Sequence, residues 1–343
     1  MNIYEYIDKY GDISFKEKVF NEIDNLVFSA IIYLNYDNSD NTIESIGKEY
    51  LKNHNYKSIK KLGPAQATGY KVLEKVVDKK RYKDILMKDY VFKHNINTQF
   101  SAATFVIDNF LNYIAFEGTD ELVSGWKEDC LLACYFPVPS HTEAINYLDK
   151  HIRLLGPDVI VGGHSKGGNL ALVSSMYVKL SKQAKIKKIY SNDGPGLRKK
   201  ELKSIRYKFI KNKYTHFVAD HTVFGILLRD EKYKTVKTTK NNVLSHDLAN
   251  WVVNDTNLEE STLSNFSMRI QKNVLDWLDK HSYEERSLMV NNVFKVLEDN
   301  NIDKVHDIVK LNNIIRIIKG LKNIDKESKE LAINLLKSVL KKA

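Results

Sequence analysis

The segment Gly163-His164-Ser165-Lys166-Gly167 constrains the fold more than any other part of this 343-residue chain. It follows the apolar run Val159-Ile160-Val161 and precedes residues 168–172, whose composition favours a helix. The pattern therefore predicts a β-strand, a sharp turn and a helix, with a serine at the apex of the turn. Glycines two residues before and two residues after Ser165 would let the strand and the helix approach each other closely.

A serine on such a turn exposes its hydroxyl above the sheet, beside the first amides of the following helix. Those amides favour negative charge at this place. We therefore interpret Ser165 as a nucleophile and the backbone amide of Lys166 as one donor to an oxyanion. The structural alternative is a glycine-rich turn from strand to helix in which Ser165 only caps the helix.

The rest of the first 258 residues predicts an α/β domain. Strands are expected near residues 104–107, 110–116, 158–162, 186–190, 214–218 and 233–238. The first two are joined by a tight Asp108-Asn109 turn, which predicts an antiparallel hairpin. The later strands alternate with helices, which predicts a mostly parallel sheet. Residues 1–95 are expected to form a helical N-terminal part of this domain.

The last third of the chain has few turn residues. No proline follows Pro195, and Gly320 is the only glycine after Gly225. Amphipathic patterns predict helices near residues 263–278, 282–297, 305–318 and 326–340. Residues 259–343 are therefore expected to form a helical appendage.

Charge and composition narrow the range of functions. The chain holds 53 Lys and Arg against 43 Asp and Glu, a formal net charge of +10. The lysines are spread along the chain, which favours a solvated surface over a nucleic-acid interface. Cys130 and Cys134 form neither a disulfide framework nor a metal-binding pattern. With no signal-like N-terminus and no long apolar run, we expect a cytoplasmic protein.

A serine nucleophile needs a base and a carboxylate that orients the base. In the α/β-hydrolase fold, the acid and then the histidine follow the serine along the chain. His246 lies in a loop after the last expected strand and is the predicted base, although a surface histidine bonded to Asp247 is an alternative. Asp220, after the strand that ends at residue 218, is the preferred acid. Asp193 is the alternative acid, since it could equally form the turn before Gly194.

A second oxyanion donor is expected after an early strand. The loop at residues 116–120 offers Gly118, which permits an unusual turn, and Thr119, which can donate both its N–H and its hydroxyl. We expect the amide of Thr119 to act together with that of Lys166. A plain turn at the end of a strand is the structural alternative.

These motifs support a resemblance to known proteins. The run at residues 115–120, with Gly125-Trp126-Lys127-Glu128-Asp129, looks like the F-R-G-T…W…D region of class 3 lipases. More closely, the chain resembles a bacterial family of uncharacterised lipase-like α/β-hydrolases. The further matching stretches are residues 10–12, 20–26, 163–169, 192–196 and 245–247. This resemblance extends to about residue 255 and implies an α/β-hydrolase core with Ser165 as nucleophile and Thr119 beside the oxyanion.

Two departures from the family pattern bear on the site. Glu117 stands where lipases usually carry arginine, and residues 218–222, around Asp220, match the family loosely. The expected activity is hydrolysis of a carboxylic ester, with an acyl lipid as one candidate substrate and with no metal or organic cofactor. Apolar residues between 122 and 136 are expected to supply a cleft for an acyl chain.

Two other classes of function are alternatives. One is a catalytically inactive binding module on a hydrolase fold. The other is a membrane-surface adaptor that makes weak contact with anionic lipid through the basic C-terminal helices. There, isoleucines between residues 314 and 318 are interspersed with Arg316, Lys319 and Lys322. Packing of these isoleucines on the core is the plainer expectation.

Overall fold

The computed structural model describes residues 1–37, 40–94, 98–308 and 310–340, and eight strands within them form one sheet in chain order. The strands are β1 (Asn41–Thr42), β2 (Leu86–His94), β3 (Gln99–Val106), β4 (Leu111–Phe116), β5 (Asp158–His164), β6 (Ile186–Asn192), β7 (Tyr214–Ala219) and β8 (Lys234–Val236). Strands β1 to β4 are antiparallel, and β4 to β8 are parallel. The expected α/β-hydrolase fold is confirmed.

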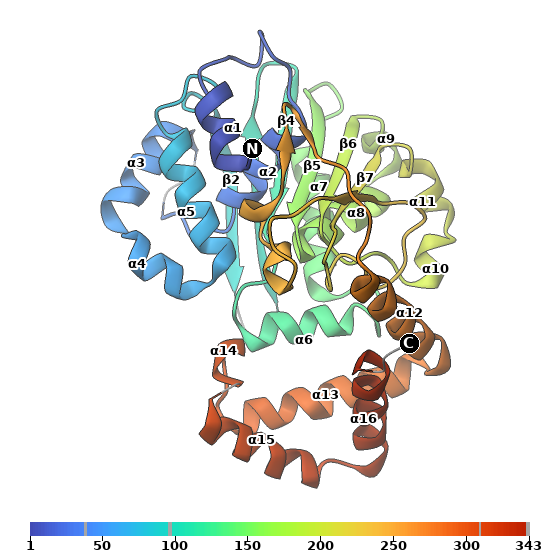
Figure 1. Cartoon of the computed structure of the whole chain (residues 1–343). Helices are drawn as coiled ribbons and strands as arrows, with labels where there is room; N and C mark the ends of the chain where they lie inside the picture. Colours follow the sequence, from blue (N-terminus) through green and yellow to red (C-terminus); the bar gives the residue numbers. More distant parts are fainter. Residues whose placement is uncertain (38–39, 95–97, 309, 341–343) are drawn as a thin grey trace.

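Helices cover both faces of this sheet (Figure 1). One layer holds α1 (Ile3–Tyr10), α2 (Glu22–Ile31), α3 (Ile43–Asn53), α4 (Tyr56–Ile59) and α5 (Pro64–Val76). The other holds α7 (Pro139–His151), α8 (Lys166–Tyr177), α9 (Leu180–Gln183), α10 (Lys199–Leu202) and α11 (Ile205–Ile210). Short 3₁₀ helices at Lys60–Leu62, Val243–His246 and Leu248–Asn250 lie in the connections.

The two-residue period of the strands divides the core between these layers. In β4, Tyr113 and Ala115 join the apolar cluster beneath α2 and α5. Their neighbours Ile114 and Phe116 point to the other face and join the cluster beneath α7 and α8. Because both faces of the central strands are buried, their sequences read as continuous apolar runs.

The N-terminal part differs from its expected all-helical character. Strand β2 lies within residues 1–95 and pairs antiparallel with β3. The pairing shifts register between Lys88 and Val91, and Asp89 has a φ of 55°. A bulge of this kind interrupts the alternation of apolar and polar residues that would reveal a strand.

Buried polar contacts fix α2 against the sheet. Asn25 donates to the Asn192 side chain at 2.9 Å, at the carboxyl end of β6. Asp24 is fully buried and accepts two hydrogen bonds from Arg81, at 2.8 and 2.6 Å. This anchoring positions Tyr33, two residues beyond the C-terminus of α2, next to the end of β5.

The C-terminal helices are α12 (Asn265–Lys280), α13 (Tyr283–Asp299), α14 (Val305–Ile308), α15 (Leu311–Asn323) and α16 (Lys326–Leu340). They follow a small hairpin of β9 (Val253–Asn254) and β10 (Asn257–Leu258) and lie beyond α6 (Val123–Leu131) (Figure 1). Trp277, Met289 and Leu331 of these helices share an apolar cluster with Leu132 and Val138 of the α/β part. No helix within the described residues has the length and apolar character to cross a bilayer.

Candidate active site

Ser165 lies at the apex of a sharp turn between β5 and α8. Its backbone has φ 57° and ψ −131°, a conformation that costs a non-glycine residue about 1–3 kcal/mol. A Cβ on Gly163 would lie 2.5 Å from the carbonyl carbon of Gly167, and one on Gly167 would lie 2.2 Å from the Phe116 oxygen. Neither position has room for a side chain, which explains the glycine spacing of the motif.

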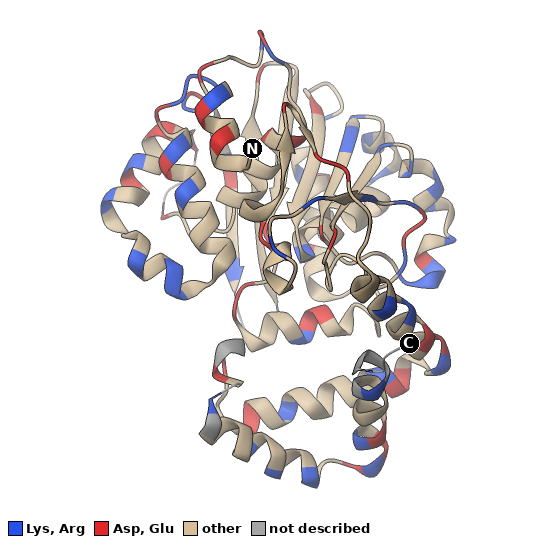
Figure 2. Ribbon diagram, in the orientation of Figure 1, with Lys and Arg blue, Asp and Glu red and all other residues tan. Residues whose placement is uncertain are grey.

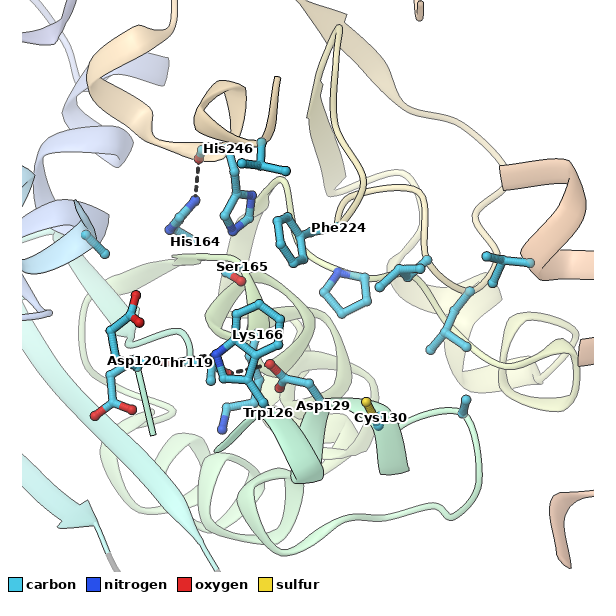
Figure 3. Close-up of a pocket in the computed structure, with 18 of the residues that line it drawn as sticks. Thr119, Asp120, Trp126, Asp129, Cys130, His164, Ser165, Lys166, Phe224 and His246 are labelled. Carbon is cyan, nitrogen blue, oxygen red and sulfur yellow. Dashed lines mark hydrogen bonds between the residues drawn. The ribbon is translucent and has the colours of Figure 1, made fainter. Parts of the chain in front are cut away.

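His246 presents its imidazole to Ser165. It ends the 3₁₀ helix Val243–His246, and its ring lies beside Ser165 in one cavity (Figure 3). The His246 ring is held between those of His164 and Phe224, each with its centroid 4.4 Å away. These contacts restrict the imidazole to one orientation.

Asp193 is the carboxylate that contacts His246. Its Oδ2 lies 2.6 Å from His246 Nδ1, and the side chain is fully buried. Because a carboxylate only accepts, Nδ1 carries the proton and Nε2 of a neutral ring is free to accept one. The Thr222 hydroxyl donates to the same carboxylate at 2.9 Å, and the Ala219 amide donates at 3.0 Å.

The expected partnership of His246 with Asp220 is absent from the described residues. Asp220 accepts from the Thr238 hydroxyl at 2.6 Å and lies 3.0 Å from His221 Nδ1. Asp193, the alternative acid, reaches His246 because its φ of 54° turns it out of the strand direction. Gly225 makes room for it, since a Cβ there would lie 2.2 Å from Asp193 Oδ1.

Asp247 also has other partners. Its Oδ1 accepts from the Thr68 hydroxyl at 2.8 Å and from the Ala249 amide at 3.1 Å. These bonds stabilise the loop that carries His246. Asp247 therefore supports the base through the backbone, and the hydrogen-bond partner of the His246 imidazole is Asp193.

His164 is a positioning residue that the sequence analysis did not assign. Its Nε2 donates to the His246 carbonyl oxygen at 2.8 Å, and its Nδ1 accepts from the Tyr33 hydroxyl at 2.9 Å. Burial, together with the nearby His246, holds the pKa of His164 well below its usual value, so the ring is neutral. The only sequence signal was its place beside Ser165, which is shared by residues with no such role.

Thr119 and Lys166, the residues expected to supply the oxyanion donors, line the same cavity as Ser165. A Cβ on Gly118 would lie 2.4 Å from the His164 oxygen and 3.0 Å from Ser165 Cβ, so the loop with Thr119 packs directly on the turn. The amide of Lys166 opens α8 and has no partner within that helix. The Thr119 hydroxyl donates to Asp129 Oδ2 at 2.6 Å, which orients the residue.

Asp129 is a further titratable group at this cavity. Burial raises its pKa to about 6, although Lys166 and the Thr119 hydrogen bond oppose the rise. Asp129 lies on α6 near Trp126, and both residues line the cavity that contains Ser165 (Figure 3).

The side chain of Lys166 is a buried support for the oxyanion region. Its Nζ donates to Glu128 Oε2 at 3.0 Å and to the Gln99 carbonyl at 3.1 Å. Glu128 Oε1 accepts from the Ser140 amide at 2.9 Å. One ion pair thus joins the start of α8 to β3, α6 and α7.

Glu117, which stands at the position where lipases usually carry arginine, forms a cluster with His94 and Asp120. Its Oε2 lies 3.1 Å from His94 Nε2, and Asp120 Oδ2 lies 3.6 Å from His94 Nδ1. Burial opposes a charge on His94, but the bonds and charges of Asp120 and Glu117 outweigh it and raise its pKa to about 9. The cation at this loop therefore belongs to His94 at neutral pH.

A cavity of about 510 Å³ leads from Ser165 into the molecule. Its apolar wall combines Trp126 and Ala133 with Phe224, Leu227 and Leu228. A second apolar part of the wall comes from the C-terminal helices, which contribute Val274, Trp277 and Leu278 of α12, Met289 and Val290 of α13, and Leu335 of α16. Of the large apolar side chains at residues 122–136 that were expected to supply the cleft, Trp126 lines the cavity, whereas Leu122, Val123, Leu131, Leu132, Tyr135 and Phe136 are not among its lining residues. No group of residues suited to hold a metal is found within the described part of the chain.

Comparisons with known proteins show the family of this chain. The family model described as Mbeg1-like matches residues 76–295, more than half of the chain. Among solved structures, the chain is similar to one titled "Crystal structure of M37 lipase", with a TM-score of 0.35 and 15% identity. That match covers 59% of this chain and 68% of the other. No curated protein matches the sequence. The predicted membership of a lipase-like family is confirmed.

The contribution of the Lys166–Glu128 pair to stability can be tested with side-chain variants that leave the Lys166 backbone amide in place. Lys166→Met should lower the free energy of unfolding by about 3–5 kcal/mol, because it leaves a buried carboxylate unpaired. The double variant Lys166→Met/Glu128→Gln should regain most of this loss, since Gln still accepts from the Ser140 amide. Urea denaturation of both variants measures the difference, and equal losses in the two would contradict this account.

The His94 cluster predicts a pH-dependent stability. A histidine whose pKa is raised on folding stabilises the protein fully below its ordinary value of 6.5, and this stabilisation is lost as the pH rises through about 9. The stability difference between the wild type and His94→Gln should therefore be largest below pH 6.5 and decline towards pH 9. Chemical denaturation across this range tests it, and a constant difference would refute the cluster's role.

Proposed function

This chain belongs to the Mbeg1-like family, and we propose that it is a serine hydrolase that cleaves carboxylic esters with an apolar acyl chain. The observation that carries the proposal is a strained serine that shares one cavity with an imidazole bonded to a buried carboxylate. In this proposal, Ser165 is the nucleophile, His246 the base and Asp193 the acid that orients it. Thr119 and Lys166 supply the oxyanion donors.

The first half-reaction follows from these positions. His246 Nε2 takes the proton of Ser165 Oγ as that oxygen attacks the ester carbonyl carbon. The amides of Lys166 and Thr119 stabilise the negative charge on the carbonyl oxygen. The tetrahedral intermediate then collapses, the bond to the alcohol oxygen breaks, and His246 delivers its proton to the departing alcohol. Ser165 is left acylated.

The second half-reaction restores the enzyme. A water molecule gives its proton to His246 Nε2 and attacks the acyl carbon, and the carboxylic acid leaves as His246 reprotonates Ser165 Oγ. Asp193 stabilises the imidazolium in both halves and keeps the proton of the neutral ring on Nδ1. Packing of the imidazole between His164 and Phe224 supports this tautomer by preventing rotation of the ring.

The cavity supports an acyl chain as the recognised group. Its wall beyond Ser165 is formed mainly by aliphatic and aromatic side chains, and its volume is typical of small-molecule sites. Each methylene buried there contributes about 0.8 kcal/mol. The catalytic function is preferred over an inactive binding module because the imidazole that shares a cavity with Ser165 is bonded to a buried carboxylate.

Paired carboxylate variants test the composition of the triad. Asp193→Asn should lower kcat about 10⁴-fold, because an amide in this position favours the wrong imidazole tautomer. Asp220→Asn should leave kcat near that of the wild type. Ester hydrolysis and labelling by a fluorophosphonate probe measure both, with Ser165→Ala as the unreactive reference. Loss of activity in Asp220→Asn alone would exclude the assignment, and full activity in Ser165→Ala would exclude the proposed function.

The cavity predicts selectivity for chain length. With p-nitrophenyl esters kept below their aggregation limits, kcat/KM should rise about tenfold for every two methylenes until the cavity is full. Met289→Trp should shift the optimum to shorter chains by filling the α13 wall, whereas Leu288→Trp, at an exposed neighbouring position, should not. A flat profile in the wild type would argue against an acyl cavity.

A further inference from the structure

Helix α15 presents an apolar surface away from the rest of the molecule. Ile314, Ile315 and Ile318 are 38%, 47% and 52% exposed. The plainer expectation, that the isoleucines of this helix pack on the core, is therefore wrong for these three. Figure 1 shows α15 as the outermost helix of the C-terminal group, on the far side of α13 from α6.

The contact between α15 and α13 shows which residues of α15 face outward. A Cβ on Gly320 would lie 2.4 Å from Val296 Cγ1 of α13, so the two helices are in close contact there. Ile317 packs against an apolar cluster that includes Leu297 and Ile302. With 100° per residue, Ile314, Ile315 and Ile318 lie away from this contact.

Two lysines share the outward arc with these isoleucines, since at 100° per residue Lys319 and Lys322 lie within it, whereas Arg316 lies nearer to Gly320. Arg316, Lys319 and Lys322 are all exposed, and the sequence has no Asp or Glu between residues 311 and 323. Figure 2 shows blue segments along α15. Arg316 donates to the Asn300 carbonyl at 2.7 Å, which keeps its guanidinium beside the helix. Exposed isoleucines interleaved with long basic side chains are the composition of a helix that lies in a lipid interface.

We propose that α15 docks this protein on an anionic lipid surface. The three isoleucines enter the boundary between headgroups and acyl chains, while Lys319 and Lys322 contact lipid phosphates. A second copy of the chain is a poorer occupant, because it would bring like charges together. A nucleic acid would leave the isoleucines in water. The proposal does not depend on the hydrolase function, since docking needs no reaction.

Docking would place the proposed site close to a source of acyl lipid. Helix α13 contacts α15 through Val296, and the same helix contributes Met289 and Val290 to the cavity wall. One helix therefore lies between the lipid-facing helix and the cavity that contains Ser165.

Co-sedimentation of the full chain with vesicles tests the docking. The wild type should bind vesicles of equal parts phosphatidylglycerol and phosphatidylcholine and should bind pure phosphatidylcholine weakly. Lys319→Gln/Lys322→Gln should weaken binding to anionic vesicles about 30-fold, at roughly 1 kcal/mol for each cation. Ile314→Ser/Ile318→Ser should weaken it as well. The circular dichroism spectrum and the thermal unfolding midpoint should stay unchanged in all variants, which shows that the fold is intact.

A matched control lies on α11, where Ile205 and Phe209 are also exposed beside basic residues. Because α11 has only six residues, it offers a smaller surface, and Ile205→Ser/Phe209→Ser should keep full binding. The proposal is overturned if the wild type does not bind, if the α11 variant loses binding while the α15 variants keep it, or if the α15 variants only change the oligomeric state without vesicles.

Discussion

The close approach of two backbones determines the geometry on which the site depends. The end of β4 contacts the first turn of α8 so tightly that Gly167 could not carry a side chain, and Gly118 is confined in the same way by the Tyr33 hydroxyl and the His164 carbonyl. The peptide groups of the oxyanion loop and the serine turn are therefore held together without intervening side chains. This contact stabilises the strained conformation of Ser165, because relaxing its φ would move α8 against the Phe116 carbonyl.

The register between β5 and β6 explains why Asp193 lies next to Ser165. His164 pairs with Asn192 in the parallel register of β5 and β6, so the residues that follow, Ser165 and Asp193, leave the sheet side by side. Both have positive φ. Asn192 is also bonded to Asn25 of α2, which joins the N-terminal layer to this edge of the sheet. Strain at both positions is stored where the surrounding structure determines the backbone.

The sequence predicted those features of the fold that are determined by local residue patterns. The turn at Ser165, the antiparallel hairpin of β3 and β4, the parallel strands after it and the loop that carries His246 follow from spacing and periodicity, and the fold was confirmed. The contact between His246 and Asp193 was not predictable, because Asp193 and Asp220 both follow strands and only the path of the 243–246 helix distinguishes them. The support from His164 likewise depends on contacts across 82 residues of chain. Both the His246–Asp193 contact and the support from His164 depend on long-range packing rather than on local composition.

For the C-terminal helices, too, the sequence predicted the helices but not the contacts that they make. Their amphipathic periodicity predicted helices, but periodicity does not determine whether an apolar face packs against the protein or is exposed to solvent. In the structure, faces of α12, α13 and α16 meet the cavity, whereas an apolar face of α15 meets solvent. The family match ends at residue 295, within α13. The cavity wall from α12 and the first part of α13 therefore belongs to the matched region, and α15 lies beyond it. The proposed acyl recognition therefore depends largely on residues inside the matched region, whereas the proposed lipid docking depends on residues outside it.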